Sequence, residues 1–406
     1  MPQSLRSLSV EARREFVEAV QLRTESFAAL CRRFQISRQT GYTYWRRFQL
    51  GGAAALPPHS RAPHQHGRAR SVRWRELLGQ LRRRHPRWGP RKLLVRLPAR
   101  GRPAAATLGR WLRELGLVAA RRPRPRRGPA LPWPGLTVPR RTNEVWTVDF
   151  KGSFRVGDGT RVNPLTVRDL FSRYVLCVRH LPDQSHAQAR RWFGRLFRRF
   201  GLPRVIRCDH GVPWASVGVR DLARLSVWWW RLGIRVEFTA RGCPGQNGSH
   251  EQHHRVLRAD TARPPARTRA AQQRRFDRWR RYYNEQRPHA ALRQTVPARH
   301  YAPRQPTGPL QLRPEARHAQ AQAVRRVRSS GEIVWEGQKR FVGDALAGQS
   351  IGLYVLSAGV WSVRFLHLEL GHLHRADPGG MRPTHFAMPP PPEKCPTSNE
   401  SEVSGM

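Results

Sequence analysis

Apolar residues recur at helical spacing through the first part of the chain. In "VEARREFVEAVQLR" the apolar positions include Val10 and Phe16, which fall on one face of a predicted helix. Ser26 and Ser37 each precede a further helical pattern, and serine is a favoured helix cap. A short helix, a tight turn and a polar helix predict a helix-turn-helix domain over residues 1–58.

The third of these predicted helices begins with polar side chains that suit a recognition helix. The first turn of such a helix enters the major groove, where arginine and glutamine reach base edges. The alternative is a plain three-helix core that makes no DNA contact. The residues expected to contact DNA are Arg38, Gln39, Thr40, Arg46 and Arg47.

Residues 68–120 repeat the amphipathic pattern and predict a second helix-turn-helix domain, whose last helix ends at Gly116. Residues 121–142 are rich in proline and arginine, and residues 121–141 read "RRPRPRRGPALPWPGLTVPRR". Such a composition excludes a regular element and predicts a stiff, basic linker that lies on phosphates or in solvent.

From residue 143 the pattern changes to alternating, β-branched runs such as "EVWTVDFKG" and "RVIRCDHG". Three strands are followed by helix, strand, helix, strand and helix, which predicts a mixed α/β domain with a central sheet over 143–300. Short β-type runs over 326–374 predict a small β-barrel-like domain, and the proline-rich residues 375–406 predict a disordered tail. The predicted chain is therefore multidomain: all-α, then α/β, then a small β domain.

The charge balance is extreme, with 75 Lys+Arg against 27 Asp+Glu and a formal net charge of +48. Arginine forks pair with phosphate, so a nucleic acid is the expected partner. A GC-rich coding sequence accounts for part of the arginine excess. The five cysteines form no C-x-x-C pair, and no run of about 18 apolar residues occurs, so we expect a cytoplasmic protein without membrane contact.

Carboxylates are scarce, which makes their positions informative. Asp149 ends the first predicted strand of the α/β domain, Asp209 ends the fourth, and Glu251 follows a glycine turn at the start of a helix. Side chains at the ends of adjacent strands converge, and three carboxylates repel each other unless they hold a cation. Oxygen ligands suit Mg²⁺ or Mn²⁺, and two such ions could flank a scissile phosphate.

A different chemistry is suggested by "HEQHH", in which His250, Glu251 and His254 form the H-E-x-x-H pattern of zinc proteases. The pattern is short, and chance matches are common in a chain with 17 histidines. A zinc protease also needs a third ligand and a peptide cleft, which the sequence does not offer. We therefore predict that Glu251 is a metal ligand and that His250 is an incidental surface residue.

The segment 143–300 resembles the integrase catalytic core of bacterial insertion-sequence transposases. The motifs that carry the resemblance are "WTVDFKG", "PLTVRDLFSRY", "CDHGVPWAS", "PGQNGSHE" and "YYNEQRPHAAL". The front half, with "ISRQTGYTYWRRF", resembles that group's helix-turn-helix region. The resemblance implies a ribonuclease H-like fold and a DDE-type catalytic triad that also binds metal. The triad residues are Asp149, Asp209 and Glu251.

The resemblance further implies a DNA transposase that cleaves and joins strands, with terminal inverted repeats and target DNA as partners. It implies a homo-oligomer on DNA, associated with the bacterial nucleoid. Lys151 and His254 are candidate phosphate contacts, and Arg168 is a candidate phosphate neighbour. For Lys151 and Arg168 the favoured alternative is surface solvation. Two positions depart from the family: His210 replaces an asparagine and Gln252 an arginine.

Two rival functions stay open at this point. A catalytically impaired copy could act as a sequence-specific DNA-binding protein, and a simple nuclease could cleave without joining. The presence of all three carboxylates argues against a DNA-binding protein without catalysis. Detection of a strand-transfer product would distinguish a transposase from a simple nuclease.

Overall fold

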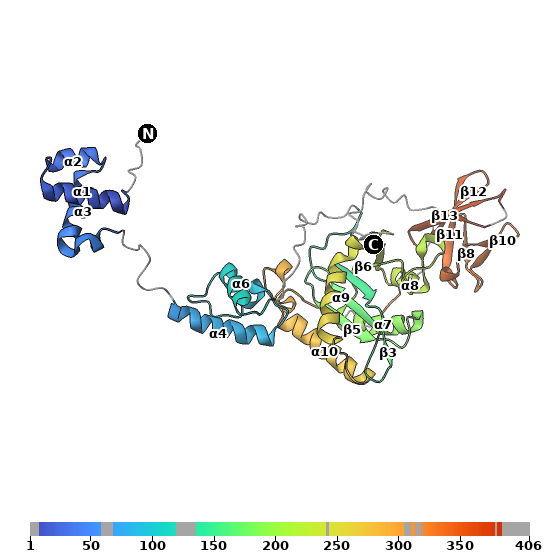
Figure 1. The fold of residues 1–406 in the computed structure, drawn as a ribbon. Coiled ribbons are helices and arrows are strands. Elements are labelled where there is room, and N and C mark those ends of the chain that lie inside the picture. Colours follow the sequence, from blue (N-terminus) through green and yellow to red (C-terminus); the bar gives the residue numbers. More distant parts are fainter. Residues whose placement is uncertain are drawn as a thin grey trace, which may run out of the picture. The chain divides into compact units, whose positions relative to one another are not determined.

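The computed structural model describes residues 8–57, 68–118, 135–240, 243–303, 310–312, 318, 320–377 and 380–383 (Figure 1). The chain divides into two compact units, Met1–Glu76 and Leu77–Met406. Among the described residues, no helix is both long and apolar enough to cross a membrane.

The N-terminal unit contains the predicted helices α1 (Val10–Leu22), α2 (Phe27–Arg33) and α3 (Arg38–Gly51), followed by the 3-10 helix η1 (Gly52–Ala55). The hydroxyls of Ser26 and Ser37 accept backbone N–H groups at the starts of α2 and α3, as predicted. A Cβ atom at Gly41 would lie 2.7 Å from the Cys31 sulfur, so only glycine lets α3 pack this closely on α2. The predicted helix-turn-helix arrangement is confirmed.

Helices α4 (Arg68–Arg84), α5 (Pro90–Leu94) and α6 (Ala105–Glu114) follow. Gly116 has a φ of 67° and ends α6 as predicted. This group packs on the core: His85 Nδ1 lies 2.9 Å from the Tyr282 hydroxyl, and Arg87 pairs with Asp260 at 2.5 Å. Because residues 95–104 separate α5 from α6, no tight turn joins them, and the second helix-turn-helix stays a prediction.

The central domain is built on a five-stranded sheet of order β5-β4-β1-β6-β7. Strands β1, β4 and β5 are antiparallel neighbours, while β6 and β7 run parallel to β1, which matches the predicted order of strands and helices. The bounds of the strands are β1 (Val145–Phe150), β2 (Phe154–Arg155), β3 (Arg161–Val162), β4 (Pro164–Asp169), β5 (Val175–His180), β6 (Val205–Cys208) and β7 (Arg235–Phe238). The bounds of the helices are α7 (His186–Phe200), α8 (Arg224–Arg231), α9 (Gly248–Thr261) and α10 (Arg269–Glu285).

Helices cover both faces of this sheet. Trp146 and Val148 of β1 point to one face, where Phe193 of α7 and Trp229 of α8 complete the largest apolar cluster. Helices α9 and α10 lie on the other face, where they pack over β5 through buried aromatic residues such as Phe276. Because side chains alternate along a strand, Thr147 and Asp149 point to the α9 face. Short 3-10 helices link the elements: η2 (Val219–Asp221), η3 (Pro244–Asn247), η4 (Ala290–Leu292) and η5 (Pro297–Arg299).

The C-terminal β domain has an open five-stranded antiparallel sheet of order β14-β13-β12-β11-β8 and a separate β9–β10 pair. Among the described strands no closed barrel is found, so the predicted barrel is not confirmed. Its core includes Leu222 and Val227, which come from the central domain. Its elements are β8 (Ala323–Arg326), β9 (Glu332–Trp335), β10 (Gln338–Phe341), η6 (Asp344–Leu346), β11 (Ser350–Ser357), β12 (Val360–Phe365), β13 (Leu368–His374) and β14 (Arg382–Pro383).

Two predicted segments are described only in part. Of the predicted tail, residues 375–377 and 380–383 are described, and β14 lies within them, while 384–406 lie outside the described residues. Of the predicted linker, 135–142 are described, and these lie on the core through hydrogen bonds that involve Thr137, Arg140 and Thr142. The end of the linker is therefore part of the folded core.

Candidate metal and phosphate site

Two aspartates lie at the same edge of the central sheet because their strands are parallel neighbours. Thr147 of β1 is paired with Arg207 of β6, and Asp149 and Asp209 each come two residues later. Alternation places both carboxylates on the α9 face. The predicted convergence of the two strand-end aspartates is therefore what the register produces.

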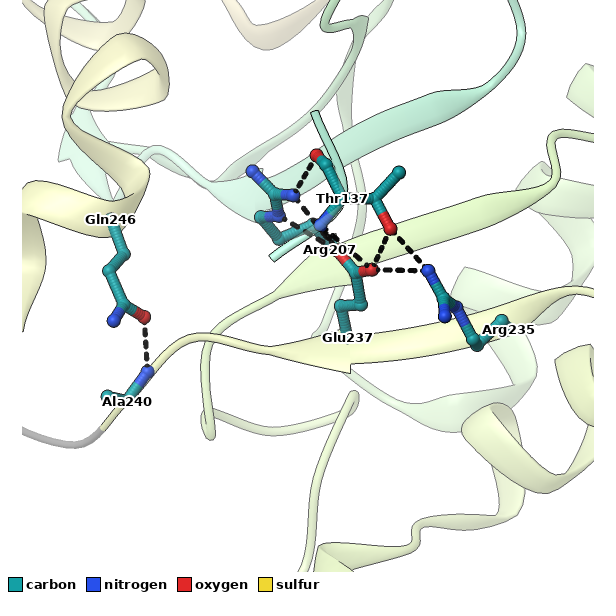
Figure 2. A network of polar contacts seen from close by, with 6 residues as sticks. All are labelled: Thr137, Arg207, Arg235, Glu237, Ala240 and Gln246. Carbon is teal, nitrogen blue, oxygen red and sulfur yellow. Dashed lines mark hydrogen bonds and ion pairs between the residues drawn. The ribbon is translucent and has the colours of Figure 1, made fainter. Parts of the chain in front are cut away.

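Glu251 lies in the first turn of α9, which local hydrogen bonds hold against the sheet. The Ser249 hydroxyl accepts hydrogen bonds from Arg168 Nη2 at 2.5 Å and from Arg173 Nη1 at 2.7 Å. Just before the helix, the Gln246 side chain accepts the Ala240 N–H at 2.6 Å, which ties the glycine turn to the end of β7 (Figure 2). These contacts fix the start of the helix that carries Glu251.

The three carboxylates interact electrostatically. Burial, the negative charge of Asp209 and then that of Glu251 together raise the pKa of Asp149 to about 7, against the opposing effects of the Phe150 backbone N–H and of Lys151. Among the described residues no ion pair neutralises Asp209 or Glu251. A buried carboxylate whose pKa is raised by two neighbouring carboxylates suits a divalent ion with oxygen ligands.

Histidines also line this site, through one shared hydroxyl. Thr166 Oγ1 donates to the Asp149 carbonyl at 2.9 Å and lies 2.7 Å from both His250 Nε2 and His254 Nε2. Because a hydroxyl has only one proton, both imidazoles must donate to Thr166. The Nδ1 lone pair of His254 then faces Asp149 Oδ2 across 3.5 Å. The sequence suggested a site lined by carboxylate oxygens alone, whereas the structure places histidine nitrogens there as well.

The zinc-protease pattern does not give a pair of free ligands. One oxygen of Asp149 and one nitrogen each of His250 and His254 lie within 4.8 Å of one another, which is compatible with metal binding. However, His250 Nε2 donates to Thr166, and His250 Nδ1 lies 2.8 Å from the Thr147 hydroxyl. Both nitrogens of His250 are thus engaged by threonines, and the imidazole cannot ligate an ion without losing one of these bonds.

Two sequence predictions about exposure are wrong. His250 is fully buried, not an incidental surface residue, because Thr147 and Thr166 supply partners for its ring. Arg168 is only 1% exposed rather than solvated at the surface. Burial lowers the pKa of both His250 and His254, to about 3 for His254, so both rings are neutral at physiological pH.

The two departures from the family lie in different environments. The nearest acidic partner of His210 is Asp221, with Nδ1 to Oδ2 at 3.4 Å, and its ring stacks on Phe238. Gln252 is exposed on α9. Neither side chain forms a hydrogen bond with Asp149, Asp209 or Glu251 in the part of the chain that the structure describes.

A basic groove of about 470 Å³ opens beside Glu251. Four cations line it, and Glu251 is the one acidic residue among them. Such a groove can hold the phosphates of a polyanion next to the carboxylates. The lining residues are Lys151, Glu251, His254, Arg255, Arg258, Ala259 and Arg263. The sequence indicated Lys151 and His254 but not the three arginines. Helical spacing from Glu251 would have pointed to Arg255 and Arg258, whereas Arg263 lies beyond the end of α9.

In the N-terminal unit, the predicted recognition residues differ in exposure. Arg38, Gln39 and Arg46 are exposed on α3, whereas Thr40 is half-buried and its hydroxyl lies 2.8 Å from that of Ser37. Arg47 is half-buried. A role of these residues in DNA binding remains a prediction, and the exposed ones have the freedom to reach a base.

Family models match both the central α/β domain and the N-terminal helices. Two models described as integrase core domains match residues 139–244 and 232–297, and a helix-turn-helix domain model matches residues 12–64. The first two cover the central sheet with all three carboxylates, and the third covers α1 to α3.

Two relatives are insertion-element proteins. The chain is 31% identical over 223 residues to the insertion element IS407 uncharacterized 31.7 kDa protein of Burkholderia multivorans, and the match covers 54% of this chain and 78% of that one. It is 28% identical over 157 residues to the insertion element IS476 uncharacterized 39.2 kDa protein of Xanthomonas euvesicatoria, covering 38% and 43%.

The solved structures that match part of this chain include two from viruses. The HTLV-2 integrase catalytic core domain in complex with magnesium is 12% identical, with a TM-score of 0.31, and covers 40% of this chain and 97% of its own. The simian T-cell lymphotropic virus intasome in complex with the PP2A regulatory subunit B56 gamma gives 16% identity and a TM-score of 0.35, covering 74% and 99%.

Proposed function

Because the chain belongs to the bacterial insertion-sequence transposases with an integrase catalytic core, we propose that it cleaves and joins the DNA of its own element. The N-terminal helix-turn-helix binds the terminal inverted repeats. The core hydrolyses one strand to free a 3′ hydroxyl, which then attacks target DNA. The single observation that carries this proposal is the edge of the sheet, where Asp149 and Asp209 lie at the ends of neighbouring parallel strands and Glu251 lies in the first turn of α9.

Each step is a displacement at phosphorus. In the first, a water oxygen bonds to the scissile phosphorus while the bond to the 3′ oxygen breaks, and that oxygen takes up a proton. In the second, the freed 3′ hydroxyl bonds to a phosphorus of the target strand and displaces that strand's 3′ oxygen. Asp149, Asp209 and Glu251 would hold Mg²⁺ or Mn²⁺, in our proposal two ions, which supplies Lewis acidity and neutralises developing charge.

The side chains of this protein position the phosphate. Lys151, Arg255, Arg258 and Arg263 line the groove beside Glu251 and can pair with phosphates on both sides of the scissile bond. His254 donates a hydrogen bond from Nε2 to Thr166, so its Nδ1 can accept a hydrogen bond from a hydroxyl or water next to Asp149. The substrates in this proposal are inverted-repeat ends and target DNA, and two ends require at least two copies of the chain.

The test is incubation of the purified chain with DNA that carries its own element ends, target plasmid and Mg²⁺. We expect nicked ends with a free 3′ hydroxyl and a product in which that end is covalently joined to the plasmid. Cleavage without any joined product would identify a simple nuclease instead. Specific binding without cleavage would identify a DNA-binding protein that has lost its chemistry.

DNA recognition is predicted to depend on the exposed start of α3. Arg38→Ala and Gln39→Ala should each weaken binding to the terminal repeat by about tenfold or more, because a base contact is worth ~1–3 kcal/mol. Gel-shift titration against repeat and unrelated DNA measures this loss. Arg14→Ala on α1 removes one exposed positive charge outside the predicted interface and serves as the control. Equal losses for Arg38→Ala and Arg14→Ala would contradict base recognition by α3.

A further inference from the structure

A buried acid and two arginines lie where β6 and β7 are paired. Glu237 of β7 is opposite Arg207 of β6, and both side chains are 8% exposed, while Arg235 is 54% exposed. Arg207 Nη2 lies 2.9 Å from Glu237 Oε2, and Arg235 Nη2 lies 2.8 Å from Oε1 (Figure 2). The two arginines therefore engage different oxygens of one carboxylate.

The fourth member of this network comes from the end of the Pro/Arg-rich linker. The Thr137 N–H points at Glu237 Oε1 across 3.2 Å, and its hydroxyl also donates to that oxygen. Arg207 Nη2 donates to the Thr137 carbonyl at 2.7 Å, and Arg235 donates to the Thr137 hydroxyl. The backbone N–H, the backbone carbonyl and the side chain of Thr137 are all engaged (Figure 2).

We call Thr137, Arg207, Arg235 and Glu237 the linker clip. A buried carboxylate is stable only when its charge is paired and its oxygens are hydrogen-bonded. The arginines supply the charge, and Thr137 supplies the remaining donors to Oε1. The network is thus complete only when the linker lies on the sheet, so the buried polar groups favour the docked position of the linker.

The linker clip lies on the same face as the carboxylates. Arg207 is two residues before Asp209, so both side chains point to the α9 face, and one two-residue step along a strand is about 6.6 Å. Downstream of Thr137 the chain reaches Asn143, whose carbonyl accepts the Arg204 N–H at the beginning of β6. Followed upstream from there, the segment runs along the sheet toward the ends of β6 and β7, where Asp209 lies.

We propose that Glu237 is a positioning residue whose linker clip holds the described end of the linker across the ends of β6 and β7 and thereby keeps Asp209, two residues after Arg207, in place at the carboxylate edge. This inference rests on the proposed function for its consequence in catalysis, whereas the docking of the linker is a property of the protein alone.

The first experiment measures docking without DNA or metal. In the full chain, Thr137→Val removes the hydroxyl that joins Glu237 to Arg235, and we expect amide hydrogen exchange of residues 135–140 to rise about tenfold. Thr137→Ser keeps the hydroxyl and should exchange like the unchanged protein. Thr160→Val, in the turn between β2 and β3, makes the same change outside the linker clip and should leave the segment unaffected.

The second experiment separates binding from positioning. With DNA of the element's ends and Mg²⁺, Thr137→Val and Glu237→Gln should lower the single-turnover cleavage rate at saturating DNA about tenfold, while the dissociation constant for that DNA stays unchanged. A loss of folded protein would lower the amplitude of the reaction rather than its rate constant. Thr137→Ser should restore the rate.

The outcomes are distinguishable. If the unchanged protein cleaves and Thr137→Val shows neither faster exchange nor slower cleavage, the linker clip proposal is overturned. If the exchange rises but no variant, including the unchanged protein, cleaves end DNA, the proposed function fails while the docking stands. If exchange rises and cleavage keeps its rate, the linker clip holds the linker but does not position the carboxylate edge, and Glu237 is not a positioning residue.

Discussion

Asp149→Asn is expected to reduce strand cleavage by about a thousandfold or more while leaving repeat-specific DNA binding unchanged. Asparagine keeps the size of the side chain but lacks the negative charge that holds a divalent ion, and that ion is worth several kcal/mol of transition-state stabilisation. Asp209→Asn and Glu251→Gln should behave in the same way. Single-turnover cleavage and gel-shift titration measure the two effects separately.

The control for these variants is Asp183→Asn, which changes an exposed acid at the turn before α7. It should cleave at the normal rate. Residual cleavage by Asp149→Asn within about tenfold of the unchanged protein would mean that the edge of the sheet is not the reaction centre. Loss of DNA binding in the same variant would mean that recognition is not confined to the N-terminal unit.

Stability measurements distinguish lost chemistry from misfolding. The folded protein holds the Asp149 proton up to a pKa of about 7, whereas an unfolded aspartate loses it near ~4. The folded state therefore binds more protons in that interval, and its stability falls as the pH rises through it. Asparagine cannot ionise, so without metal Asp149→Asn should be more stable than the unchanged protein at pH 8, by on the order of 1 kcal/mol or more. A lower melting temperature would contradict this electrostatic account.

The carboxylate edge could be predicted from the sequence because strand ends are marked by simple patterns. "WTVDF" and "RVIRCD" each run from apolar residues into an aspartate, and parallel neighbours bring such ends together. The register of β1 with β6 agrees with that expectation. The helix caps Ser26 and Ser37 were predictable for the same reason, since capping is a local interaction.

What the sequence did not indicate depends on contacts between distant segments. His250 is buried because Thr147 and Thr166, on two different strands, both reach its ring. The linker end docks because Glu237 and Arg207 face each other across a strand pair. The predicted β-barrel-like domain is not confirmed for a related reason. Short β-type runs show that strands exist, but closure depends on how edge strands pair, and among the described strands β14 and β8 are the edges of the sheet.

Cleavage is also expected to require Mg²⁺ or Mn²⁺ absolutely and to stop when EDTA is added. Asp149, Asp209 and Glu251 provide hard oxygen ligands, whereas His250 has both nitrogens engaged by threonines, so zinc should not substitute. Activity can be followed after chelation and re-addition of each metal. Cleavage that persists in EDTA, or that only zinc restores, would overturn the assignment of the ligands.

The pH dependence of Mg²⁺ binding provides a second, independent test of the carboxylate ligands. An ion can bind only after Asp149 has lost its proton, and burial together with Asp209 and Glu251 raises the pKa of that proton to about 7. Below pH 7 the apparent Mg²⁺ affinity should therefore fall about tenfold per pH unit, and above pH 8 it should level off.

His254 faces the same carboxylate but does not produce this slope. The pKa of His254 is lowered to about 3, mainly by burial, so its ring is neutral from pH 5 to 9. Replacing His254 by asparagine should consequently change the affinity without moving the midpoint, as titration calorimetry at several pH values would show. An affinity that is flat between pH 5.5 and 8, with the release of no proton, would mean that Asp149 is ionised before the ion arrives and that its carboxylate neighbours do not act on it.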